Sequence, residues 1–374
     1  MTSYSLYVHV PFCKRKCDYC DFPSYAGKEH LIPDYVDALR SEMGYISSLM
    51  DRPKISTVYF GGGTPTLLDN ESIEDILRSI HGDFDVEQDA EISFEANPKT
   101  ADKDKLKTLK RCGVNRLSIG AQSFENRILK KLGRIHLKHD IEEVFGAARD
   151  AGFRNINLDL MFAIPSQGMQ DWMNSLESAI NLKPEHISTY NLQIEEGTPF
   201  HTEMQEGTLR PFDEELEYNM YKDCITHLLS KGYRQYEISN FAKKGYECRH
   251  NITYWTMNDY IGLGAGAHSF IQGIRSENTP DLDKYLTKKF NEIRTDHKLT
   301  SKETMSEMVF LGLRMIEGLP LKRFMTKFKF GLLNVYNKEI DELKKGGLVT
   351  VDSKAIKLTL KGLFLANEVF KKFI

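Results

Sequence analysis

Residues 7–20 read YVHVPFCKRKCDYC, and this stretch decides the fold. The residues up to Val10 are rich in β-branched and aromatic side chains, as in a buried strand. Cys13, Cys17 and Cys20 follow at once with the spacing C-x-x-x-C-x-x-C, and no fourth cysteine stands near them. Three thiolates can bind three irons of a [4Fe–4S] cluster and leave the fourth iron open to another ligand. The stretch therefore predicts a strand that leads into a reactive iron–sulfur site.

Two other uses of the cysteines fit the sequence less well. A disulfide joins cysteines in pairs and belongs to oxidising compartments, whereas these three lie within eight residues of the chain. A structural zinc site usually has a second C-x-x-C pair, which this sequence lacks. Aromatic residues surround the cysteines and predict an apolar shell that limits solvent access: Tyr7, Phe12, Tyr19 and Phe22.

The composition is that of an ordinary globular protein, with 41% hydrophobic and 28% charged residues among 374. This length suffices for two or three domains. A net charge of -3 provides no basic footprint for a nucleic-acid partner. No apolar run approaches the roughly 18 residues of a membrane span, and the residues before Cys13 resemble a strand rather than a signal peptide. We therefore expect a cytoplasmic protein. Cys112 and Cys224 stand in helix-like segments, and we expect them to be small core residues rather than ligands.

Strand-like and helix-like segments alternate over the first half of the chain. The strand-like segments are short and rich in β-branched or aromatic residues, and they cover residues 5–10, 57–60, 91–95, 116–119, 155–160 and 186–192. Amphipathic stretches separate them, so we expect parallel strands with right-handed crossovers. A closed eight-stranded barrel takes about 250 residues, so six units within about 200 residues predict an open, partial (β/α)6 TIM-like barrel of the α/β class.

Polar and glycine residues stand where the predicted strands end. They are the run Gly61 to Thr66 after the second strand, Glu95 and Asn97 at the third, Gln122 after the fourth, Asp159 in the fifth and Gln193 after the sixth. A glycine run by itself usually marks a turn. The carboxyl edge of a parallel sheet, however, is where such folds collect their chemistry. We therefore expect one composite site at this edge, together with the three cysteines.

We expect three parts in the chain. Residues 1–235 form the barrel core, residues 236–300 are a connecting segment, and residues 301–374 form a C-terminal domain. The last part predicts three helices, a two-stranded wing and a final helix, which is a winged-helix-like α+β arrangement. Because this part has no basic face, we do not infer DNA binding from it.

These residues together resemble the radical S-adenosylmethionine (SAM) superfamily, in the branch related to oxygen-independent coproporphyrinogen III dehydrogenase. The resemblance covers essentially the whole chain and rests on residues 7–20, on Gly61 to Thr66 and on the C-terminal part. It implies a [4Fe–4S] cluster bound by Cys13, Cys17 and Cys20. It also implies SAM, which chelates the open iron and is cleaved by one electron to methionine and a 5′-deoxyadenosyl radical.

The resemblance also implies which residues bind SAM. They are Tyr7, Tyr19, Gly63, Thr64, Glu95, Gln122, Arg134 and Asp159. Arg134 suits a carboxylate because a guanidinium can bond one bidentately. Gln193 and His268 occupy matching positions, although the residue types agree less well. We expect His136 and His139 on a solvated helix face.

Two departures separate this chain from the dehydrogenases of that branch. Those enzymes carry a further cysteine two residues after the last cluster ligand, where this chain has Phe22, and they carry an N-terminal extension that helps to hold the substrate. The related heme chaperones of the HemW type have a phenylalanine there and a short N-terminus. They also have an H-N-x-x-Y-W motif, matched here by His250, Asn251, Tyr254 and Trp255.

That motif is chemically suited to heme. A neutral imidazole such as His250 can be an axial ligand to iron, and tyrosine and tryptophan offer flat apolar surfaces for a macrocycle. Cys248 is a second candidate ligand. Without the family resemblance, the favoured interpretation of the motif is an H-N pair that caps a turn and a Tyr-Trp pair in the core.

The resemblance therefore implies a heme chaperone on a radical SAM scaffold, monomeric or homodimeric. It would pass heme to hemoproteins, including respiratory-chain enzymes at the membrane. The alternative is an enzyme that oxidatively decarboxylates coproporphyrinogen III to protoporphyrinogen IX, so whether the protein is an enzyme stays open. A zinc or structural iron–sulfur protein is a third hypothesis, and it leaves the glycine run and Arg134 without a role.

Overall fold

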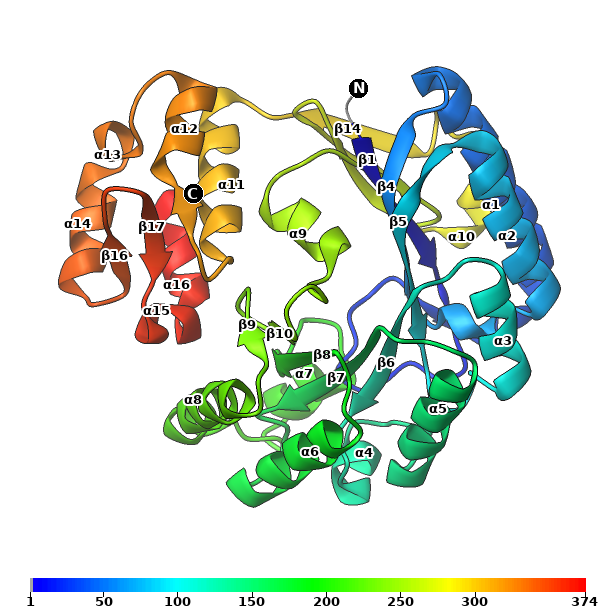
Figure 1. Cartoon of the computed structure of the whole chain (residues 1–374), viewed down its shortest axis with the longest axis horizontal. Helices are drawn as coiled ribbons and strands as arrows, with labels where there is room; N and C mark the ends of the chain where they lie inside the picture. Colours follow the sequence, from blue (N-terminus) through cyan, green and yellow to red (C-terminus); the bar gives the residue numbers. More distant parts are fainter. Residues whose placement is uncertain (1–2) are drawn as a thin grey trace.

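Six parallel strands form the centre of a 12-stranded sheet in the computed structural model, which describes residues 3–374 (Figure 1). In order across the sheet they are β1 (Ser3–Val10), β4 (Lys54–Gly62), β5 (Asp85–Ala96), β6 (Arg116–Gln122), β7 (Ile156–Phe162) and β8 (His186–Asn191). Every neighbouring pair among them is parallel. These strands match the six predicted from the sequence, so the α/β class and the partial barrel are confirmed.

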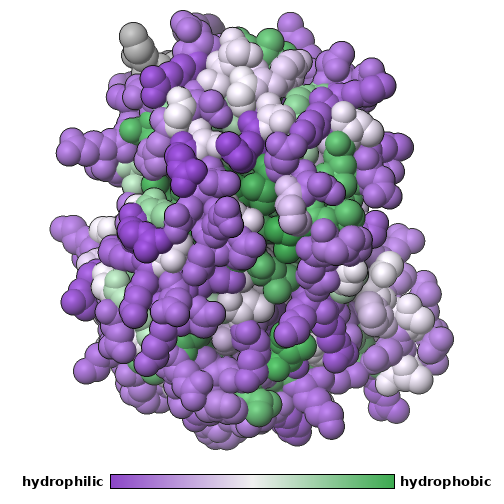
Figure 2. All heavy atoms as spheres, turned by 90° about the vertical axis from the view of Figure 1, so that its right-hand side faces the viewer, coloured by the Kyte–Doolittle hydropathy of each residue, from purple (hydrophilic) through white to green (hydrophobic). Residues whose placement is uncertain are grey.

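Helices follow these strands along the chain, and most of them cover the outer, convex face of the curved sheet (Figure 1). They are α1 (Ile32–Met50), α2 (Asn70–Asp83), α3 (Lys103–Arg111), α4 (Asn126–Lys131), α5 (Lys138–Asp150), α6 (Met169–Asn181), α7 (Pro199–Gln205) and α8 (Glu214–Ser230). Helix α1 illustrates the pattern: it carries a proline in its first turn and buries Tyr35, Leu39, Met43 and Ile46 on one face. Figure 2 shows that the outer face is mainly hydrophilic, with apolar residues only in patches.

The sheet continues beyond the parallel strands at both edges. Next to β1 lies the parallel strand β11 (Tyr260–Leu263), followed by β12 (His268–Ile271), β13 (Ile274–Asn278) and β14 (Arg294–Lys298), with α10 (Leu282–Tyr285) before β14. Beyond β8 lie β10 (Asn240–Ala242) and β9 (Arg234–Gln235). Residues 236–300, predicted as a connecting segment, thus contribute β10 to β14 to the same sheet as the barrel core.

Helix α9 (Arg249–Trp255) lies inside the curve of the sheet (Figure 1). The carboxylate of Glu91 on β5 holds its first turn: one oxygen accepts the backbone N–H of His250 and the other that of Arg249, both at 3.2 Å. A negative charge at a helix N-terminus is favourable because it meets unpaired N–H groups. Residues 248–255 therefore form a plug against the inner face of the barrel.

The C-terminal part has its own hydrophobic core. Its helices are α11 (Ser301–Leu313), α12 (Leu321–Phe328), α13 (Leu332–Val335), α14 (Asn337–Lys345), α15 (Leu360–Phe364) and α16 (Ala366–Phe370). Strands β15 (Leu319–Pro320), β17 (Ala355–Leu358) and β16 (Val349–Val351) form one sheet in this order, with one strand more than the predicted wing. Tyr260 and Phe270 of the main sheet also join this core, so the two parts share a packed boundary.

Candidate functional site

A cavity of about 470 Å³ opens at the carboxyl ends of the parallel strands. All three cysteines of the motif line it. Seven of the eight residues predicted to bind SAM line it as well, namely Tyr19, Gly63, Thr64, Glu95, Gln122, Arg134 and Asp159. The structure thus brings together groups that are spread over about 150 residues of sequence, and we call this space the cysteine cavity.

The cysteines sit in a loop that follows β1. Cys13 ends the short strand β2 (Phe12–Cys13), which pairs with β3 (Tyr25–Ala26), and it is buried. The backbone N–H of Cys20 donates to the carbonyl of Cys17 at 3.1 Å, which closes the loop. Burial raises the pKa of Cys20 to about 11, and the sulfurs of Cys17 and Cys13 add to this rise. Close thiols of this kind stay protonated until a metal displaces their protons.

The cysteine loop does not gather its thiols at one point as a mononuclear metal site does. Within residues 3–374, no three His, Cys, Asp or Glu side chains converge as a mononuclear site requires. In a cluster each thiolate binds its own iron, so the sulfurs need not meet at one point. Gly63 packs against the loop so closely that a Cβ would lie 2.6 Å from the carbonyl oxygen of Phe12 and 3.0 Å from Sγ of Cys13. The missing side chain at Gly63 thus lets the glycine run pack directly against the cysteine loop.

Arg134 approaches the cysteines from the opposite wall. One terminal nitrogen of its guanidinium donates to Gly120 O at 3.0 Å, and the other lies 3.6 Å from Sγ of Cys17. Its Nε is buried without a partner. Gln122 stands nearby at a register shift between β6 and β7, in the left-handed backbone region with φ 64°. Such strained positions turn a side chain away from the sheet plane, here into the cavity.

Two carboxyl groups lie half-buried at the floor of the cavity. The pKa of Glu95 rises to about 8, chiefly because of burial and also because of the nearby Asp159 charge. Tyr59 donates its hydroxyl to Glu95 Oε1 at 2.9 Å. Burial also raises the pKa of Asp159, which accepts bonds from Ser118 and Asn157 at 3.0 and 2.8 Å. The floor therefore offers acceptors to hydroxyl or amine groups, while Arg134 offers donors to an anion.

The remaining predicted residues lie elsewhere. The hydroxyl of Tyr7 is bonded to Nδ1 of His9 at 2.9 Å, and its ring lines a second cavity, so its role at SAM stays a prediction. Gln193 lines the cysteine cavity and His268 the second one. The prediction for His136 was wrong: it is fully buried, its Nε2 is bonded to Ala121 O at 3.1 Å, and burial lowers its pKa to about 4.

His250 is part of the plug and does not face a cavity. Its side chain is buried, with Nδ1 at 2.8 Å from Thr57 Oγ1 and Nε2 at 2.7 Å from the Tyr254 hydroxyl. Burial lowers its pKa to about 3, so the imidazole is neutral. Cys248 is buried too, and its Sγ donates to Glu91 at 3.6 Å. Neither group is free to bind iron in this conformation.

The second cavity, of about 440 Å³, lies between the cysteine loop and β11 to β12. Aromatic rings make much of its wall: Phe22, Tyr254, Trp255, Tyr260 and Phe270. Phe22 is 61% exposed at its edge. His268 lines it with an exposed ring whose nearest acidic partner, Glu277, is 4.0 Å away. Sequence reasoning missed this aromatic cavity because its residues come from distant segments with no shared pattern.

Comparisons with known proteins cover the whole chain. Residues 7–179 match the radical SAM superfamily and residues 299–365 the HemN C-terminal domain. The heme chaperone HemW of Bacillus subtilis is 39% identical over 374 residues, 99% of each chain. That of Escherichia coli is 34% identical over 380 residues, 99% of this chain and 98% of the relative.

One solved structure matches the complete fold. It is that of coproporphyrinogen III oxidase (HemN) from Escherichia coli, which is described as a radical SAM enzyme. The TM-score is 0.86 at 25% identity, over 100% of this chain and 90% of that chain. No helix within residues 3–374 is long and apolar enough to cross a bilayer.

Proposed function

Because this chain belongs to the family of the heme chaperones HemW, a branch of the radical SAM superfamily, we propose that it binds heme and passes it to hemoproteins. The recipients we propose include respiratory-chain enzymes at the membrane, served by a cytoplasmic monomer or homodimer. The radical SAM family implies a [4Fe–4S] cluster and SAM in addition. The observation that carries the heme proposal is the aromatic cavity, since Tyr254 and Trp255 of the H-N-x-x-Y-W motif are part of its wall.

The cysteine cavity has the side chains that a cluster and SAM require. Cys13, Cys17 and Cys20 would hold the cluster, and when bound, cluster and SAM supply one-electron chemistry at the open iron. Gly63 and Thr64 line the cavity and can offer backbone groups to a ligand. Arg134 offers donors to a carboxylate, and Glu95 and Asp159 offer acceptors to hydroxyl groups.

The aromatic cavity has the size of a small-molecule site and a lining that suits a flat ring system. Its volume lies within the range of roughly 300–1,000 Å³ typical of small-molecule sites. Flat rings of Phe22, Tyr254 and Trp255 can stack on a macrocycle. His268 is the imidazole that faces this cavity without a hydrogen bond, whereas His250 must first leave Thr57 and Tyr254. His250, the ligand predicted from the motif, and His268 are thus alternative iron ligands.

A heme titration of reconstituted protein tests the function and the ligand together. We expect a Soret band shift with saturable binding, weakened by Phe22→Ala at the cavity edge. If His268→Ala loses the spectral signature of imidazole bound to the heme iron, His268 is the iron ligand. If His250→Ala loses it, His250 is the iron ligand. His139→Ala is the control, because this histidine is 58% exposed on α5. Absence of saturable heme binding by the parent chain would refute the proposal.

Oxidative decarboxylation of coproporphyrinogen III is the second candidate function. The match to coproporphyrinogen III oxidase over the full chain favours it. Phe22, in place of a further cysteine, speaks against it. Reduced protein incubated with SAM and coproporphyrinogen III under anaerobic conditions separates the two, because mass spectrometry detects the loss of two carboxyl groups. We expect the porphyrinogen to stay intact.

A further inference from the structure

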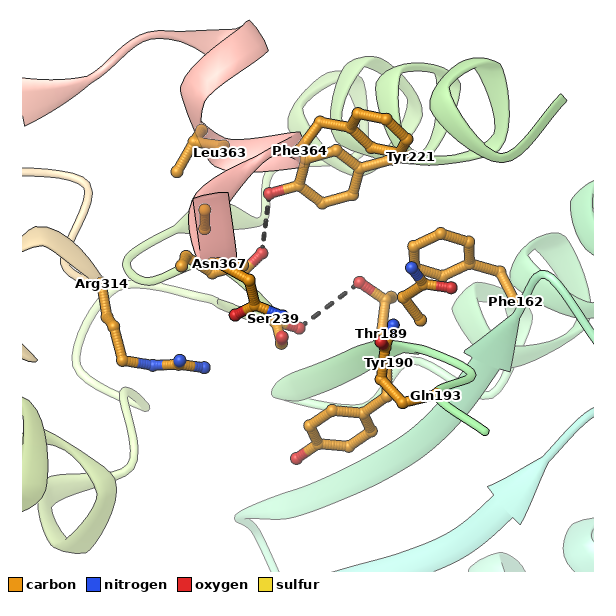
Figure 3. Close-up of a pocket in the computed structure, with 13 residues that line it drawn as sticks. Phe162, Thr189, Tyr190, Gln193, Tyr221, Ser239, Arg314, Leu363, Phe364 and Asn367 are labelled. Atoms are coloured by element: carbon orange, nitrogen blue, oxygen red, sulfur yellow. Dashed lines mark hydrogen bonds between the residues drawn. The ribbon is translucent and has the colours of Figure 1, made fainter. Parts of the chain in front are cut away.

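A third cavity, of about 180 Å³, lies between the end of β8 and the C-terminal helices α15 and α16 (Figure 3). Its walls come from Thr189 to Gln193, from Ser239, and from Leu363 to Asn367. Arg314, directly after α11, is the one charged residue among those that line it. Figure 3 shows the Arg314 guanidinium directed into the cavity, toward the space between Ser239 and the ring of Tyr190. We call this space the Arg314 cavity.

The charge of Arg314 has no hydrogen-bonded protein partner, although the carboxyl of Glu237 lies close enough to act against the lowering of its pKa. Among the described residues, its side chain takes part in no hydrogen bond and in no ion pair, and its Nε is buried. Burial accordingly lowers the pKa of Arg314. The guanidinium is held by stacking instead, with its central carbon 4.3 Å from the ring centre of Trp255 and 5.9 Å from that of Phe370. A partly buried cation without hydrogen-bond acceptors lowers the stability of the folded chain. Such an arrangement therefore points to a bound anion that is not part of the chain.

The nearest acidic group does not fill this role. Glu237 is fully buried and does not line the cavity, and its Oε1 accepts the backbone N–H of Ser239 at 2.9 Å. Burial raises the pKa of Glu237, although the charge of Arg314 acts in the opposite direction, and Oε2 of Glu237 is buried without a hydrogen-bond partner among residues 3–374. No ion pair joins Glu237 to Arg314 within the part of the chain that the structure describes. The guanidinium donors thus remain available to the cavity.

The other lining residues define what kind of anion fits. Tyr190, Ser239 and Asn367 present neutral polar groups, while Phe162, Tyr221 and Phe364 present apolar rings. A carboxylate on a short aliphatic arm combines both properties. The volume is below the roughly 300 Å³ at which small-molecule sites begin, so a whole tetrapyrrole does not fit. Residues 190, 191 and 193 also line the cysteine cavity, so these two cavities share a wall, while Trp255, which stacks on Arg314, lines the aromatic cavity.

We propose that the Arg314 cavity is a carboxylate-binding site, in which Arg314 binds the acid and Trp255 positions the guanidinium. The carboxylate belongs either to a propionate of heme or to a small free acid. The propionate form of the proposal rests on the proposed function. In the first case, Trp255 of the motif contributes to heme recognition through Arg314. The role deduced here is independent of any iron ligand.

Heme and its dimethyl ester distinguish these sources, because esterification removes the propionate charges. We expect reconstituted parent chain to bind heme about ten- to a hundredfold more tightly than the ester, the range of one charge-assisted hydrogen-bonded pair. Arg314→Gln should bind both with the weaker affinity, and Arg314→Lys should fall between. Arg210→Gln, which removes a charge from an exposed loop, is the matched control. If the parent and Arg314→Gln prefer heme over its dimethyl ester by the same factor, Arg314 does not bind a heme propionate.

A thermal-unfolding series with sodium propionate, succinate and phosphate tests the site without heme. Protection of the parent chain and not of Arg314→Gln supports a carboxylate site, even if the chain binds no heme and the proposed function fails. Arg314→Gln without ligand should be no less stable than the parent, since it removes an unpaired buried charge. If the acids protect both proteins equally and heme affinity is also unchanged, the Arg314 cavity is not an anion site.

Discussion

The imidazole of His250 stacks on the ring of Tyr59, with ring centres 5.1 Å apart and an angle of 27° between the planes. Tyr59 in turn donates its hydroxyl to Glu95 in the cysteine cavity. A residue of the H-N-x-x-Y-W motif is therefore in contact with the wall of the predicted SAM site through one side chain. Withdrawal of His250 from the plug would free Tyr59 and alter the surroundings of Glu95.

The first prediction concerns the plug. His250→Ala removes a buried ring and leaves Thr57 and Tyr254 without their bonds, so it should lower the free energy of unfolding by about 2–4 kcal/mol. Urea unfolding of the iron-free protein measures this. The exposed His139→Ala should stay within about 0.5 kcal/mol of the parent. A stable His250→Ala protein would mean that the plug does not depend on this side chain.

The second prediction concerns pH. The pKa of Glu95 is raised from 4.5 to about 8, so between these values the folded chain keeps a proton that the unfolded chain has released. Raising the pH through this window therefore favours unfolding. The parent should therefore lose stability between pH 5 and pH 8, whereas Glu95→Gln should not. The difference in the free energy of unfolding between the two proteins should shift in favour of Glu95→Gln by about 2 kcal/mol over this range, after allowance for partial solvent access. Parallel pH curves for the two iron-free proteins would contradict this.

The third prediction compares two glycines. Gly63→Ala places a methyl group against Phe12 and Cys13, so it should cost about 1–3 kcal/mol and reduce the iron bound after reconstitution. Gly82→Ala, in α2, meets no atom within 4 Å and should stabilise the chain by about 0.5–1 kcal/mol. Iron analysis and thermal unfolding check both. Full iron loading of Gly63→Ala would show that the close approach is not required.

The fourth prediction concerns Arg134. Arg134→Gln removes the guanidinium that faces the cysteines, and we expect SAM affinity to fall about ten- to a hundredfold. Anaerobic equilibrium dialysis with labelled SAM measures the change. Arg127→Gln, which lies outside the cavity and pairs with Asp171, is the control and should bind SAM as the parent does. Unchanged affinity in Arg134→Gln would remove this residue from the predicted SAM site.

The fifth prediction concerns the cluster ligands. Cys13→Ser should abolish the iron–sulfur absorbance, because a hydroxyl does not replace a thiolate as an iron ligand. Cys112→Ser should keep the full iron content, since Cys112 lies at the end of α3 and not in the cysteine cavity. Retention of four irons per chain in Cys13→Ser would refute the assignment of this cysteine.

The strands and the cysteine cavity were predictable because their signals are local. A run such as residues 5–10 shows its buried character in its own composition, and parallel topology then brings the strand ends to one edge. Arg134 and Asp159 could be placed from the family resemblance and from that edge. The predicted loop and rim therefore agree with the structure.

The orientation of His250 was not predictable from its neighbours in sequence. Its partner Thr57 stands 193 positions earlier in the chain, and the carboxylate that holds α9 belongs to Glu91. The Arg314 cavity is likewise assembled from residues between Phe162 and Asn367. His136 was predicted on a solvated face, yet it precedes α5 and its ring is bonded to the carbonyl of Ala121, 15 positions earlier in the chain. Tertiary packing decides all of these positions.

The place of β1 in the sheet has a consequence for biosynthesis. Leu6 pairs with Val58 on one side and with Ile261 on the other, so the second neighbour leaves the ribosome about 250 residues after the first strand. At roughly 5–20 residues per second, one edge of β1 stays open on the order of tens of seconds. The cysteine loop directly follows this strand, whose second edge is still unpaired at that stage. Before β11 is synthesised, one edge of β1 is unpaired, so we expect the cysteine loop to reach its final surroundings, and to take up iron in them, only near the end of synthesis.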